Sequence, residues 1–148
     1  MAKYNLQKFI DAQAKDFETA LREVKAGCKT SHWMWFIFPQ IIGLAQSRTS
    51  IFYSIQNLEE ASLYMADETL SAHMNEICNA LLELDGNDAH KIFGYPDDMK
   101  LHSCMTLFAQ ACPDNDIFKK VIDKYFEGEE DRRTIELIGW KTFVDSNE

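Results

Sequence analysis

The sequence lacks an apolar run near the roughly 18 residues that a membrane-spanning helix needs. Its first residues, MAKYNLQKF, also lack the apolar core of a signal peptide. We therefore expect a cytoplasmic protein with no membrane partner. A chain of 148 residues is of the size that forms one domain with a sizeable core.

The chain is poor in cysteine, with four residues and no C-x-x-C pair or zinc-ribbon spacing. Most of the cysteines lie among apolar residues, where a free thiol behaves as a small hydrophobic group. We expect reduced thiols, no metal site and no cofactor.

Positive charge is scarce in most of the sequence. Residues 57–148 carry eight lysines and arginines against twenty aspartates and glutamates, whereas residues 1–56 carry seven against four. An acidic surface repels phosphate backbones, so we expect no nucleic-acid partner. The mildly basic first third is compatible with a small anionic ligand, and equally with a chance imbalance on solvated faces.

Alternating strand patterns are missing, and helical periodicity dominates. The sequence predicts an all-α fold, with residues 1–148 forming a single compact domain of about seven or eight helices. Residues of a type that caps helices precede several of the apolar stripes, at Asn5, Ser31, Asn57, Asp67 and Asp131. Glycine at position 139 is expected to stop the last helix, and the tail is expected to be frayed from about residue 141.

The usual catalytic signatures are also missing: there is no G-x-S-x-G elbow and no glycine-rich phosphate loop. If the protein is an enzyme, His32 is the best candidate for general acid or base, because imidazole titrates nearest neutrality. The competing interpretation is a hydrogen-bonded structural histidine beside the core. Whether the chain is an enzyme therefore stays open.

What the sequence does have is an aromatic run, WMWFIF at residues 33–38, with polar residues at both ends. We favour a short buried helix there. A second helix over residues 96–111 places Lys100, Ser103 and Thr106 on one side. Those two hydroxyls either line a cavity or bond back to their own helix carbonyls. Gln13 falls on the apolar stripe of the helix expected after Asn5. Its amide either finds a hydrogen-bond partner in the core or contacts a ligand.

Three motifs together resemble a known family: SHWMWFIFPQ followed by GL and a serine, then FG-x-PDD-x-K, then S-x-MTLF. The chain is similar over residues 6 to about 138 to the uncharacterised bacterial domain-of-unknown-function family eighteen-ten. The resemblance implies a compact helical domain and no established activity. The name calpastatin, sometimes attached to this family, is not carried over, because that inhibitor is a disordered repeat protein. The sequence departs from the family pattern at Ala45 and Cys104.

These observations predict a pocket with an aromatic wall and a cationic end, which are features of small-molecule sites. It would bind or process a small anionic, nucleotide-like metabolite. Besides His32, the residues expected to line it are Ser31, Trp33, Trp35, Gln40, Ser47, Lys100, Ser103 and Thr106. Two alternatives stay open: a protein-interaction module that uses exposed tryptophans such as Trp33, Trp35 or Trp140, and motifs that only mark the fold. The sequence identifies neither the ligand nor the oligomeric state.

Overall fold

The computed structural model describes residues 3–147. These residues form nine helices, joined by loops, and no strand. The helices are α1 (Gln7–Lys25), α2 (Met34–Ile37), α3 (Arg48–Phe52), α4 (Leu58–Ala66), α5 (Glu68–Glu83), α6 (Ala89–Phe93), α7 (Asp97–Ala111), α8 (Ile117–Tyr125) and α9 (Arg132–Ser146). The all-α class is confirmed. There is one helix more than the seven or eight expected, and α2, α3 and α6 have only four or five residues each.

Side-chain caps start three of the longer helices where the sequence places them. The Asn57 side chain accepts from the backbone N–H of Glu60 at 2.9 Å, and that of Asp67 accepts from Leu70 at 2.9 Å. Asp131 caps α9 in the same way. Each cap satisfies a backbone donor that has no partner inside its helix, so a local sequence signal was sufficient to find it.

Three expected helix ends are wrong. Leu6, not Asn5, precedes α1, and it makes no side-chain cap. Ser31 is bonded to another helix, and α2 begins only after Trp33. Gly139 does not stop α9, and residues after 141, expected to be frayed, are helical to Ser146.

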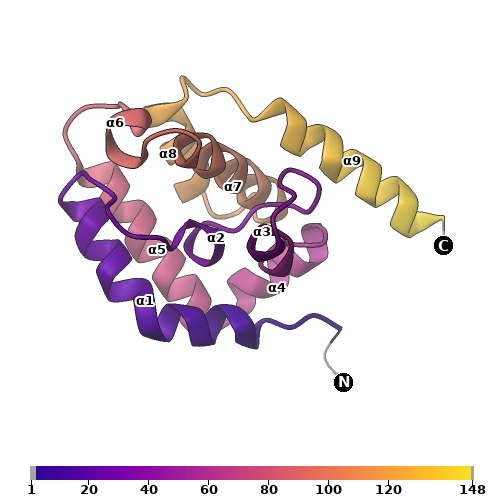
Figure 1. Cartoon of the computed structure of the whole chain (residues 1–148). Helices are drawn as coiled ribbons and strands as arrows, with labels where there is room; N and C mark the ends of the chain where they lie inside the picture. Colours follow the sequence, from indigo (N-terminus) through magenta and orange to yellow (C-terminus); the bar gives the residue numbers. More distant parts are fainter. Residues whose placement is uncertain (1–2, 148) are drawn as a thin grey trace.

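Helix α7 lies at the centre and packs against α4, α6, α8 and α9, whereas α5 lies behind α1 and packs against α1, α4 and α8 (Figure 1). Seven residues of α7 are buried, as befits a central helix. Most of the aromatic run is also buried. It packs on α1 and against Phe93, whose ring centroid is 6.3 Å from that of Trp33 and 6.0 Å from that of Phe38. None of the described helices is long and apolar enough to cross a membrane.

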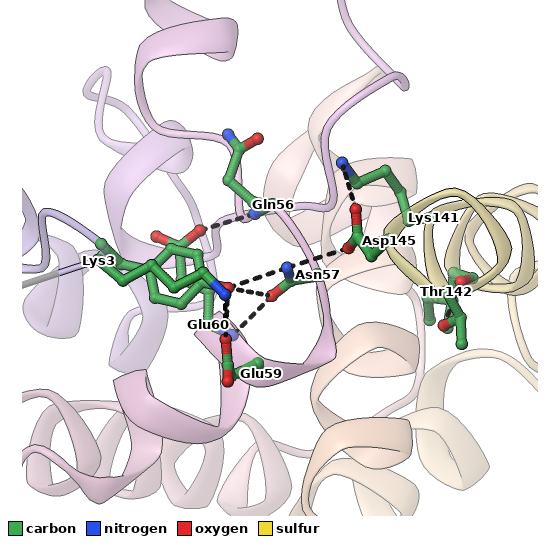
Figure 2. Close-up of polar contacts among 10 residues, drawn as sticks. Lys3, Gln56, Asn57, Glu59, Glu60, Lys141, Thr142 and Asp145 are labelled. Carbon is green, nitrogen blue, oxygen red and sulfur yellow. Dashed lines mark hydrogen bonds and ion pairs between the residues drawn. The ribbon is translucent and has the colours of Figure 1, made fainter. Parts of the chain in front are cut away.

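Helix α9 lies at the edge of the molecule and is held near both ends (Figure 1). At its C-terminal end, the Asn57 amide donates to Asp145 at 3.3 Å, and Lys141 pairs with Asp145 at 3.7 Å. Figure 2 shows these groups converging on the start of α4. Between the two ends only Thr134 and Ile138 are buried, so the opposite side of α9 faces solvent.

Candidate functional site

Two lysines share one carboxylate at the first turn of α7. Lys29 Nζ lies 2.8 Å from Asp97 Oδ2, and Lys100 Nζ lies 3.4 Å from Asp97 Oδ1. Only 8% of the Lys29 side chain and 20% of the Lys100 side chain are exposed. The cluster therefore holds one more positive than negative charge in a partly shielded place, where electrostatic attraction is stronger than in open water.

Tryptophan rings form the wall beside these lysines. Lys29 Nζ is 5.1 Å from the centre of the Trp33 ring, and Lys100 Nζ is 5.7 Å from that of Trp35. Both distances fall within the range of cation–π attraction. The structure thus brings Lys100 together with the aromatic run, and we call Lys29, Lys100, Asp97, Trp33 and Trp35 the lysine–tryptophan cluster.

A small cavity borders Trp35. It is lined by Trp35, Gln40, Ile41, Leu44, Ala45, Ser50, Tyr53 and Ser54, and its volume is about 10 Å³. That is room for about one water molecule. A metabolite would therefore have to bind at the surface, with the Gln40 amide as the neighbouring polar group.

The polar residues before the aromatic run are organised by a carboxylate on α1. Glu23 is buried and accepts from the backbone N–H groups of Thr30 and Ser31, at 2.8 and 3.0 Å, and from Trp33 Nε1 at 3.0 Å. The Ser31 hydroxyl donates to its other oxygen. Burial opposes ionisation, but the bonds from Ser31, Thr30 and Trp33 outweigh it and lower the pKa of Glu23 to about 2.

Three hydroxyls from the expected site serve as helix caps or anchors. Ser47 caps α3 by accepting from the Ser50 N–H at 3.1 Å. Ser103 donates to the Asp131 carboxylate at 2.9 Å and to the Met99 carbonyl at 3.1 Å. Thr106 is fully buried and accepts from the Asp131 N–H at 2.9 Å. Ser103 and Thr106 do share a side of α7, and that side fastens the start of α9.

The remaining candidate, His32, is exposed and lies between Ser31 and Trp33 in the chain. Of the nine predicted residues, the structure groups Trp33, Trp35 and Lys100 in one cluster and places Gln40 beside Trp35. Sequence reasoning missed Lys29, Asp97 and Glu23 as members of this region. Glu23 could have been found, because it falls three residues after Ala20 on the buried stripe of α1.

Removing the carboxylate of Asp131 should loosen α9. We expect Asp131→Ala to lower the free energy of unfolding by about 2 kcal/mol, because it deletes an N-cap and the partner of the Ser103 hydroxyl. Urea unfolding followed by circular dichroism measures the effect. Asp116→Ala is the matched control, since Asp116 precedes α8 without a side-chain cap bond. Equal losses in the two variants would contradict the anchoring role.

Within residues 3–147, no group of three or more histidine, cysteine, aspartate or glutamate side chains is arranged to hold a metal ion. The buried thiols of Cys78 and Cys104 are poor nucleophiles, because burial raises the pKa of each.

Comparison with known proteins gives a family and a solved structure. Residues 3–138 match the model of the family described as "Protein of unknown function (DUF1810)". The chain is also similar to the conserved hypothetical protein Rv1873 from Mycobacterium tuberculosis, whose crystal structure was solved at 1.38 Å. The two are 40% identical with a TM-score of 0.90, covering 93% of this chain and 99% of that one. A search of curated proteins gave no match.

Proposed function

Since the chain belongs to the DUF1810 family of proteins of unknown function, we propose its function from its own geometry: it binds a small anionic, nucleotide-like metabolite at the lysine–tryptophan cluster. The observation that carries this proposal is the sharing of one carboxylate, Asp97, by two shielded ammonium groups. An anion at the cluster would neutralise the surplus positive charge through charge-assisted hydrogen bonds.

The partly exposed ring of Trp35 is the reason for proposing a ligand that contains a base. Trp33 is 1% exposed, so its ring belongs to the core, whereas Trp35 is only partly buried and borders Gln40. A base would stack on the Trp35 ring while its phosphate meets Lys100, with the Gln40 amide within the same surface. Base stacking on aromatic side chains contributes about 1–3 kcal/mol.

The test is a thermal-shift screen with nucleotides, ADP-ribose, NAD and sugar phosphates. A ligand that stabilises the wild type should bind Lys100→Met about ten- to a hundredfold more weakly, the loss expected for one charge-assisted bond. The variant stays folded, because methionine keeps most of the apolar stem and Asp97 retains Lys29. Lys15→Met, at an exposed position of α1, is the control.

Two outcomes would count against the cluster. Stabilisation of the wild type and Lys100→Met by the same ligand to the same extent would place the site elsewhere. No stabilisation by any compound would remove this ligand class. His32→Ala, tested in parallel, reports whether the exposed imidazole takes part in binding, and any turnover of a bound ligand that is lost in this variant would give His32 its acid–base role.

The alternative of a protein-interaction module has one observation in its favour. Trp140 is 59% exposed, unlike Trp33. This residue lies on α9 and is not a member of the lysine–tryptophan cluster.

A further inference from the structure

The solvent side of α9 carries large apolar side chains. Trp140 is 59% exposed, Phe143 67% and Ile135 37%. Single exposed apolar residues are ordinary on protein surfaces, but several on one helix face form a patch that marks an interaction site.

A glycine sits at the middle of the same helix. Gly139 is the central residue of α9, and a Cβ built there would meet no atom within 4 Å. Glycine is disfavoured inside helices, and this fold does not require it at that position. Ile135, Gly139 and Phe143 follow one another at four-residue spacing, so they lie along one side of the helix. Between two bulky residues, the glycine leaves a notch where another backbone can approach closely.

We propose that two copies of the chain associate through this face, with their α9 helices antiparallel and crossing at Gly139. A two-fold axis through the crossing makes the contact self-complementary. It sets Ile135 against the partner's Phe143 and Phe143 against the partner's Ile135, while Gly139 lies over its own counterpart. Trp140 then covers the flank of the contact.

Charge favours a second copy over another kind of partner. The first turn of α9 carries Arg132 and Arg133 and no acidic residue, and its last turn carries no basic residue. The arginines oppose the dipole of the helix itself, which is positive at the N-terminus and negative at the C-terminus, and the Asp131 cap offsets part of this opposition. In the antiparallel pair, the arginines of each copy lie beside the negative end of the other helix.

The size of the surface sets the expected affinity. One helix face is smaller than the about 800 Å² that each partner buries in a standard interface. We therefore expect a weak dimer with a micromolar dissociation constant. The family match ends at Ile138. Of the residues in the proposed contact, only Ile135 lies within the match, and Gly139, Trp140 and Phe143 lie after it. The pairing is accordingly inferred for this chain and not for its relatives.

Sedimentation velocity across a range of concentrations tests the association. The wild type should move from monomer toward dimer as concentration rises, and Gly139→Leu and Phe143→Ser should each weaken the dimer tenfold or more. Leucine favours the helix more than glycine does and has open space around it, so a folded monomer is retained. Ala72→Leu, on an exposed part of α5, is the control and should behave as wild type. A wild type that stays monomeric, or a dimer unaffected by both variants, would overturn the proposal.

Disulfide trapping tests the orientation. In a Cys28→Ser background, which removes the exposed native thiol, Gly139→Cys should form an intermolecular disulfide on mild oxidation. Arg132→Cys should not. With a rise of about 1.5 Å per residue, two copies of position 132 are about 21 Å apart in the antiparallel pair, beyond the about 7 Å limit for a disulfide. Efficient trapping through position 132, or none through 139, would exclude the antiparallel crossing.

Discussion

Replacing Glu23 with glutamine is expected to lower the free energy of unfolding at neutral pH by about 3 kcal/mol. The pKa of Glu23 falls from 4.5 to about 2 in the folded protein, and each pKa unit corresponds to about 1.36 kcal/mol. Glutamine keeps the shape and one acceptor oxygen but has no charge. It therefore imitates the protonated carboxyl, to which Ser31, Thr30 and Trp33 bond more weakly.

Glu23→Gln should also remove part of the decrease in the free energy of unfolding that acid causes in the wild type. Because the folded-state pKa lies below the unfolded one, the contribution of Glu23 is complete above about pH 5 and is lost as pH falls from 4.5 toward 2. By pH 3 more than half of the about 3 kcal/mol should be gone. Urea unfolding at pH 7, 5, 4 and 3 should show the wild-type curve descending toward that of Glu23→Gln, with the difference at pH 3 less than half of that at pH 7.

Glu18→Gln provides the control on the same helix, because Glu18 is exposed. It should change stability by less than about 0.5 kcal/mol at every pH. If wild type and Glu23→Gln instead lose stability in parallel, the carboxylate is not what holds residues 30–33 in place.

Glu23 also shows where sequence reasoning stops. The caps at Asn57, Asp67 and Asp131 were predictable because each bonds to a backbone group three residues away. Ser31 looked like another such cap, but a carboxylate eight residues earlier in the chain takes its hydroxyl. A capping signal reports only local donors and acceptors, so it cannot reveal a competing partner supplied by another helix.

The α7 residues show a second limit of sequence reasoning, which concerns the surroundings of a helix face. Helical spacing correctly placed Lys100, Ser103 and Thr106 on one side, but spacing does not say what that side faces. In the structure the hydroxyls face Asp131, and the lysine faces Asp97 on its own first turn. The aromatic wall was predicted because six consecutive apolar residues must be buried or bind something. Lys29 was missed because its partner, Asp97, lies far away in the sequence.

The continuation of α9 through Gly139 has a related cause. Glycine ends a helix when the chain must turn with positive φ, as it does at Gly27 after α1. Contacts with other parts of the fold lie on both sides of position 139 and keep α9 helical: Ile138 is buried, and Asp145 accepts from the Asn57 amide. Tertiary contacts therefore decide whether a glycine stops a helix or sits within one.

A second large effect is expected from Gln13→Leu, which should lower the free energy of unfolding by about 3–4 kcal/mol. The buried Gln13 amide donates to the Phe36 carbonyl and to the Tyr64 hydroxyl, both at 2.8 Å. Its oxygen is 2.8 Å from Nδ1 of His73. Burial lowers the pKa of His73, so the ring is neutral at pH 7 and donates to the amide. Leucine matches the volume but leaves these three groups without their partner.

Gln7→Leu is the control for this substitution, since Gln7 is exposed on the same helix, and we expect a change below about 0.5 kcal/mol. A double-mutant cycle with Tyr64→Phe then separates hydrogen bonding from packing. In the wild-type background, losing the Tyr64 hydroxyl removes a satisfied bond and should destabilise the fold by about 1–2 kcal/mol. In the Gln13→Leu background, the hydroxyl is already buried without a partner, so its removal should be neutral or stabilising. Additive losses across the cycle would mean that the hydrogen bond between Gln13 and Tyr64 does not contribute to the stability of the fold.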